Sequence, residues 1–136
     1  MELHPAFRGG WKTSAMPSLN RIQQYWLRRP GALTDGLRQL GQVEIRLITE
    51  HATGLSPGEA WLLGLPPCVP VWLREIVMSI DGVNCVVARS ITPLKASHGP
   101  WHSMRRLHTR PLADMLYQDS TITRSVFFSR RLNRHQ

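Results

Sequence analysis

Two β-rich runs joined by Asp81-Gly82 constrain this chain more than any other stretch. The runs cover residues 71–80 and 83–93. A type I′ turn needs positive φ at both of its central residues, and an Asp-Gly pair adopts such angles at low cost. The sequence therefore predicts a β-hairpin with a two-residue turn.

The predicted hairpin brings two arginines together. With Asp81 and Gly82 as the turn residues, Arg74 lies directly opposite Arg89, and alternate residues of a strand share one face. The face that carries these arginines is otherwise apolar, with Trp72, Ile76, Met78 and Ile80 on one strand and Cys85, Val87 and Ile91 on the other. Opposed like charges destabilise a sheet, and a buried cation must be paired. We therefore expect a dicarboxylate, or two carboxylates, at this position.

Other arrangements of the two arginines are compatible with the same residues. An acid of the chain itself could neutralise them, or one arginine could lie at the sheet margin and reach water along its aliphatic stem. None of the nine acidic residues is obviously placed to neutralise two guanidiniums. The register is a test, because a three-residue loop would put Arg74 and Arg89 on opposite faces, whereas a four-residue loop would keep them on one face.

Length and charge limit the class of protein. A chain of 136 residues predicts a single domain over residues 1–136, with residues 1–17 as a loosely held arm. No uncharged run approaches the roughly 18 residues that a membrane span needs, and no secretory signal is evident, so we expect a cytoplasmic protein. The formal charge of +8 suits either nonspecific phosphate binding or attraction of a small anionic substrate. Because no nucleic-acid recognition motif is present, no nucleic-acid partner is predicted.

The cysteines and histidines do not predict a metal site. Cys68 and Cys85 lack CxxC spacing and are expected to be buried free thiols. His98 and His102 have the spacing of one helix face, but Gly99-Pro100 between them interrupts a helix.

Segments before the hairpin predict two helices and a strand. Ser18 or Asn20 can cap a helix that runs through Leu27. A second helix is expected near residues 34–40, with Leu33 and Leu37 facing inward. Alternation of apolar and polar residues over 43–50 predicts a strand beside the hairpin.

Segments between and after these strands predict short helices and one more strand. Residues 59–63 can form at most a helical turn or a short strand. Prolines open short helices near 101–107 and 111–117. Residues 120–128 are rich in β-branched and aromatic side chains and predict a strand that returns to the sheet. The whole order predicts an α+β domain, an antiparallel sheet with helices gathered on one side.

Five short motifs are similar in order and approximate spacing to those of the chorismate lyase family. They are Trp72-Leu73-Arg74-Glu75-Ile76, Asp81-Gly82, Ala88-Arg89-Ser90, Arg110-Pro111-Leu112 and Ser120-Thr121-Ile122-Thr123-Arg124. The resemblance extends from about Leu19 to Arg124. It implies an antiparallel six-stranded sheet with short helices as flaps over a pocket for a small ligand. It also implies cleavage of chorismate to 4-hydroxybenzoate and pyruvate, which begins ubiquinone biosynthesis in many bacteria, without a cofactor or metal.

The resemblance assigns substrate-binding roles to four residues. Arg74 resembles the arginine that binds the ring carboxylate, and Arg89 the one associated with the pyruvyl side. Leu112 matches the position whose backbone helps to hold hydroxybenzoate, although its periodicity fits core packing equally well. Leu33 aligns with a hydrophobic position near the first flap that often carries methionine. No general base can be assigned, so the catalytic residues stay unknown.

One departure from the family concerns a glutamate. Family members continue to a final strand whose glutamate hydrogen-bonds the ligand hydroxyl, whereas no acid follows Asp119 here. We expect a truncated or frame-shifted member with impaired activity, or a chain in which another group replaces the glutamate. An exposed sheet edge is expected to lower stability or to permit a dimer, although the family is monomeric.

Two other functions remain open. One is a catalytically silent domain that binds an aromatic acid on the same fold, and the missing glutamate favours it. The other is a basic nucleic-acid-binding protein, whose affinity would fall steeply with salt. Binding of an aromatic acid in a pocket should instead be lost in Arg74→Ala.

Overall fold

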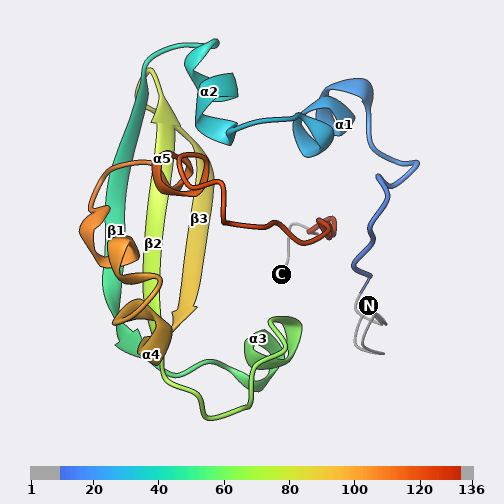
Figure 1. The fold of residues 1–136 in the computed structure, drawn as a ribbon. Coiled ribbons are helices and arrows are strands. Elements are labelled where there is room, and N and C mark those ends of the chain that lie inside the picture. The colour runs from blue at the N-terminus through green and yellow to red at the C-terminus, as the bar shows by residue number, and fades with distance from the viewer. Residues whose placement is uncertain (1–9, 133–136) are drawn as a thin grey trace. The chain divides into compact units, whose positions relative to one another are not determined.

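The computed structural model of the chain describes residues 10–132. The chain divides into two compact units, one formed by Ala32–Ile122 and the other by the segments up to Gly31 and from Thr123 onward. The sheet lies in the Ala32–Ile122 unit (Figure 1). The single domain over residues 1–136 stays a prediction, as does the arm at residues 1–17, of which residues 1–9 lie outside the described part.

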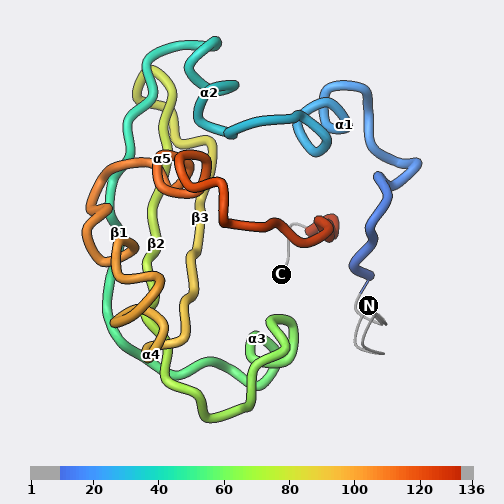
Figure 2. The backbone as a smooth tube through the Cα atoms, in the orientation of Figure 1, coloured from blue at the N-terminus to red at the C-terminus, as the bar shows by residue number. Residues whose placement is uncertain are grey.

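Three antiparallel strands form this sheet in the order β1-β2-β3. They are β1 (Val43–Thr53), β2 (Val71–Ile80) and β3 (Val83–Pro93). Asp81 and Gly82 have φ values of 48° and 82°, which confirms the predicted tight turn. Figure 2 shows the chain reversing sharply between β2 and β3. The strand predicted beside the hairpin is confirmed as β1, so β2 is the central strand.

A single extra residue in β3 changes the register of the hairpin. Pairing is regular next to the turn and shifts by one residue between Ser79 and Met78, so that Cys85 has no partner residue on β2 and forms a β-bulge. Beyond the bulge, Arg89 pairs with Glu75 and not with Arg74. Because alternate residues of a strand point to opposite faces, Arg74 and Arg89 lie on opposite faces of the sheet. The prediction that these two arginines face each other is therefore wrong.

A layer of short helices covers the face of the sheet to which Arg74 belongs (Figure 1). The layer follows β3 and consists of α4 (Leu94–Ser97), the 3-10 helix η2 (His102–Arg106) and α5 (Leu112–Leu116). Met104 and Leu107 of this layer are buried, as is Ile76 on β2. The helices predicted near 101–107 and 111–117 are confirmed, and the α+β class with them.

Two further helices belong to the same unit. They are α2 (Leu33–Arg38) and α3 (Pro57–Leu62). Helix α2 buries Leu37 but leaves Leu33 40% exposed, so the predicted inward orientation of Leu33 is wrong. Helix α3 begins with a capping box between Ser56 and Glu59. Among residues 10–132, no helix is both long enough and apolar enough to cross a membrane.

The other unit contains helix α1 (Arg21–Arg28). Asn20 caps it as predicted, since its Oδ1 accepts a hydrogen bond of 2.8 Å from the backbone N–H of Gln23. The strand predicted over residues 120–128 is not formed, and a lone bridge instead joins Lys12 to Ser129. β-Propensity stabilises a strand only through its packing against neighbouring strands. Within residues 10–132 the sheet has three strands, against the six implied by the resemblance.

Candidate functional site

The candidate site is built around the guanidinium of Arg74 on the central strand. Only 1% of this residue is exposed to solvent. Burial removes water from the cation and lowers the pKa of Arg74 from its usual value, because a poorly solvated site disfavours the charged form, and the negative charge of Glu50 offsets part of this effect. An arginine nevertheless stays protonated at neutral pH. The sheet therefore carries a buried positive charge on its helix-covered face.

The loop between η2 and α5 holds one edge of this guanidinium. The carbonyl of His108 accepts hydrogen bonds from Nε at 3.3 Å and from Nη2 at 2.7 Å, and the carbonyl of Arg110 accepts from Nη2 at 2.9 Å. His108 has a φ of 49°, in the left-handed region that few residues other than glycine adopt. Both partners of Arg74 are thus neutral main-chain groups.

The remaining nitrogen of Arg74, Nη1, has unused hydrogen-bonding capacity. Nη1 is buried and has no hydrogen-bond partner among residues 10–132. The ion pairs of the described residues join Arg38 to Asp35 and Arg89 to two glutamates, and none includes Arg74. A buried charge without a direct ion-pair partner is costly. The arrangement can therefore accept an anion, and a carboxylate on Nη1 would make a charge-assisted hydrogen bond.

Leu112 belongs to a segment that contacts Arg74. It is the first residue of α5 and follows Arg110, whose carbonyl bonds to Arg74, by two positions. Its side chain is half-buried, and no side chain caps the helix that it begins. Leu33 begins a different helix, α2. The structure thus brings Arg74 and the segment that contains Leu112 together.

Arg89 lies on the other face of the sheet and already has two acidic partners. Its Nη2 is 2.8 Å from Oε1 of Glu59 on α3, and its Nη1 is 2.8 Å from Oε1 of Glu75 on β2. The Arg89 side chain is 37% exposed. The alternative in which acids of the chain neutralise an arginine therefore holds for Arg89, and the bulge at Cys85 is what moves Arg89 next to Glu75.

A second polar cluster lies beside Arg74 on the same face. Nε1 of Trp72 donates a hydrogen bond of 3.2 Å to Oε1 of Glu50, and the guanidinium carbon of Arg105 lies 4.0 Å from the centre of the Trp72 ring. Arg105 in turn donates to Oγ of Ser97 from Nε and from Nη2, both at 3.1 Å. Our sequence reasoning missed this cluster, because its members come from β1, β2, α4 and η2 and no sequence motif links them.

The cysteines and histidines of the described residues form no metal site. Within the part of the chain that the structure describes, no three His, Cys, Asp or Glu side chains converge on a possible metal position. Cys68 and Cys85 are free and exposed, so the expectation of buried thiols is wrong. Cys85 is exposed on β3, where it is the bulge residue.

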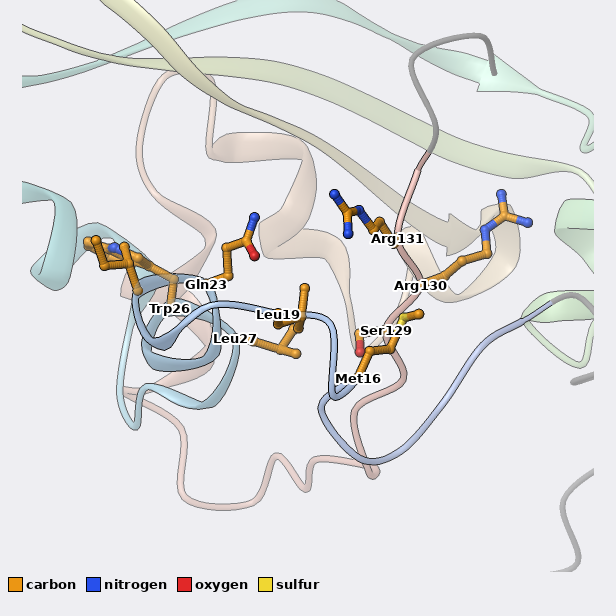
Figure 3. A pocket seen from close by; sticks show the side chains of 9 residues that line it. Met16, Leu19, Gln23, Trp26, Leu27, Ser129, Arg130 and Arg131 are labelled. Carbon is orange, nitrogen blue, oxygen red and sulfur yellow. The ribbon is translucent and has the colours of Figure 1, made fainter.

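An open hollow of about 450 Å³ lies in the unit that contains α1. Figure 3 shows its lining, which comes from residues 16–27 and from Ser129, Arg130 and Arg131. Most of the lining is apolar, and its two arginines are exposed. None of the four predicted binding residues lines this hollow, and it offers no buried charge like that of Arg74. The candidate site therefore stays at Arg74.

Comparison with known protein families identifies the family of this chain. The family model described as chorismate lyase matches residues 8–131, which is most of the chain. This chain belongs to the chorismate lyase family. The family resemblance that the five sequence motifs indicated is thereby confirmed.

Similar proteins carry the name of the same family. A probable chorismate pyruvate-lyase of Bordetella avium is 57% identical over 124 residues, which cover 91% of this chain and 63% of the relative. One from Bordetella pertussis is 58% identical over 123 residues, 90% of this chain and 65% of the relative. Probable chorismate pyruvate-lyase 1 of Pseudomonas fluorescens is 36% identical over 117 residues, 86% of this chain and 63% of the relative. The chain spans a little under two thirds of the length of these relatives.

Proposed function

We propose that this member of the chorismate lyase family binds chorismate at Arg74 and cleaves it to 4-hydroxybenzoate and pyruvate. The observation that supports this most directly is the buried guanidinium whose Nη1 has no partner among residues 10–132. The ring carboxylate of chorismate would pair directly with Nη1. A guanidinium bound to a carboxylate in a site without water also fixes the orientation of the ring.

The proposed reaction needs no external reagent. A proton leaves C4 of chorismate, the bond between C3 and the ether oxygen breaks, and the ring becomes aromatic. The departing enolpyruvate takes up a proton on its methylene carbon and becomes pyruvate. Because aromatisation drives the reaction, the protein mainly orients the substrate and balances charge on the departing group. The proposal includes no cofactor and assigns no general base.

Three other residues are considered as ligand contacts, and the observations that bear on each differ. The backbone at Leu112 is proposed to help hold the hydroxybenzoate ring, which its place two residues after Arg110 supports. Leu33 is proposed as an apolar contact, and a ligand would cover its exposed side chain. A role for Arg89 on the pyruvyl side stays a prediction, and the two glutamates bonded to Arg89 argue against direct contact with substrate.

The same proposal covers the cellular role and the assembly of the protein. We propose a cytoplasmic enzyme whose 4-hydroxybenzoate enters ubiquinone biosynthesis.

We also propose a monomer that can dimerise through a sheet edge, since β1 and β3 each have one side without a strand partner among residues 10–132. Analytical ultracentrifugation at two protein concentrations would detect that dimer.

Turnover of chorismate tests the proposed function. Purified protein is incubated with chorismate, and 4-hydroxybenzoate is measured by chromatography against a blank without protein. Two variants are compared, Arg74→Ala and the matched control Arg106→Ala, which removes an exposed arginine of η2. We expect product from wild type and Arg106→Ala, and at least about thirtyfold less from Arg74→Ala, because truncating one partner of a buried charged pair is costly.

Two other outcomes are informative. Wild-type rates in Arg74→Ala would overturn the role of Arg74. If neither wild type nor the variants form product but wild type still binds 4-hydroxybenzoate, the proposal of lyase activity is wrong. The alternative, a catalytically silent binding domain, is then supported.

A further inference from the structure

Glu50 is the acid that the sheet places nearest to Arg74. The two residues are directly opposite partners in the β1–β2 ladder and therefore share a face. Side chains in that relation have Cβ atoms about 4.5–5.5 Å apart, and opposite charges there normally attract each other. The charge of Glu50 partly offsets the burial that lowers the pKa of Arg74, yet none of the ion pairs among residues 10–132 joins the two side chains directly. Something must direct the Glu50 carboxylate elsewhere.

Trp72 provides the competing partner. Its indole Nε1 donates a hydrogen bond of 3.2 Å to Oε1 of Glu50. Trp72 precedes Arg74 by two residues on β2, so its ring lies on the same face of the sheet. The carboxylate that would otherwise neutralise Arg74 is thus bonded to the neighbouring indole.

The Trp72 ring is itself held in place. The guanidinium carbon of Arg105 lies 4.0 Å from the centre of the ring, within the range of a cation–π contact. Arg105 is fixed by two hydrogen bonds to Oγ of Ser97, which is fully buried. The indole N–H therefore points at Glu50 from a ring that packing and a cation keep in one orientation.

We propose that Trp72 is a positioning residue that holds Glu50 away from Arg74 and so keeps Nη1 of Arg74 open to the carboxylate of a ligand. Without the indole N–H, Glu50 turns toward Arg74 and forms an internal ion pair. That ion pair competes with a ligand carboxylate for the same guanidinium. The consequence for substrate binding rests on the proposed function, whereas the restraint on Glu50 does not.

The restraint is tested first in the protein without ligand. Glu50→Gln, Arg74→Gln and the double variant are made with Trp72 present and again with Trp72→Phe, which keeps a smaller aromatic ring under Arg105 and removes the N–H donor. Urea unfolding followed by circular dichroism gives the coupling between Glu50 and Arg74 in each background. We expect the coupling in the unfolding equilibrium constant to be at least about fivefold larger with Trp72→Phe, as for a new charge-assisted hydrogen bond. Equal coupling in both backgrounds would overturn the proposal.

Binding of 4-hydroxybenzoate, measured by calorimetry, tests the consequence for a ligand. Trp72→Phe should weaken binding about tenfold, and the double variant Trp72→Phe/Glu50→Gln should recover most of that loss. Trp61→Phe, the same change on α3, should leave the affinity unchanged. If Trp72 acted only by packing, the double variant would bind as weakly as Trp72→Phe, and the proposal would be wrong.

The two arms separate this inference from the proposed function. Failure of the wild-type protein to bind 4-hydroxybenzoate, together with increased coupling in the unfolding experiment, would contradict the proposed ligand and support the restraint by Trp72. Binding by wild type with no recovery in the double variant would support the ligand and contradict the restraint.

Discussion

Arg74 and Arg89 lie on neighbouring strands, on opposite faces of the sheet, and differ in how their charge is balanced. Arg74 is buried and bonded to two neutral carbonyls, whereas Arg89 is partly exposed and bonded to two carboxylates. An exposed ion pair of the second kind contributes little to stability and does not need a ligand. A buried cation of the first kind has no direct ion-pair partner among residues 10–132, and a ligand carboxylate would supply one. This difference makes Arg74 the better candidate for contact with substrate.

His108 holds strain next to the candidate site. Its φ of 49° costs a residue with a Cβ atom about 1–2 kcal/mol, and glycine avoids this cost while losing somewhat more entropy on folding. We expect His108→Gly to raise the free energy of unfolding by about 0.5–1 kcal/mol. Urea unfolding measures this change.

The matched control for that prediction is His108→Ala, which removes the same imidazole but keeps the Cβ atom and therefore the strain. It should give no gain in stability. Equal stability of the glycine and alanine variants would show that backbone strain at position 108 is not what limits stability.

Elements that depend on residues close together in the sequence could be predicted from it. The Asp81-Gly82 turn and the Asn20 cap depend on residues within four positions of each other, and both formed as predicted. The bulge at Cys85 could not be predicted, because one extra residue in a strand is decided by packing on both faces of the sheet. That single residue separated Arg74 from Arg89 and reversed the predicted geometry of the site.

Glu59 of helix α3 takes part both in the capping box with Ser56 and in an ion pair with Arg89. A hydrogen bond from the backbone N–H of Ser56 is the main cause that lowers the pKa of Glu59 from its usual 4.5, and the positive charge of Arg89 lowers it further. A carboxyl whose pKa is lower in the folded state stabilises that state when ionised. Its contribution is therefore complete at neutral pH and is lost as the pH falls below about 4.5 and through the folded-state pKa.

Glu59→Gln tests this contribution. Because Glu59 is partly exposed, we expect the variant to lose only about 0.5 kcal/mol at pH 7 and the difference from wild type to shrink at pH 3. Urea unfolding at both pH values measures it, with Glu44→Gln on the exposed side of β1 as a control that should show no such difference. A difference for Glu59→Gln that is the same at pH 7 and pH 3 would contradict the assignment.

For the whole molecule, sequence motifs identified the family and the order of predicted elements gave the class of fold, but neither predicted the conformation of every segment. Residues 120–128 have the composition of a strand and yet form none, since a strand needs partners that composition does not supply. The cluster of Glu50, Trp72 and Arg105 was also missed, because only folding brings these elements together. The alternation of residues along the predicted strand did place Arg74 on an apolar face, and Arg74 is buried there.

The most direct test of the central claim, that Arg74 is the carboxylate-binding group, is calorimetric titration with 4-hydroxybenzoate. Wild type, Arg74→Ala and Arg106→Ala are compared in the same buffer, after circular dichroism has shown that each is folded. The account predicts binding to wild type and Arg106→Ala, and an affinity at least about thirtyfold lower for Arg74→Ala. Equal affinity of Arg74→Ala and wild type would contradict it.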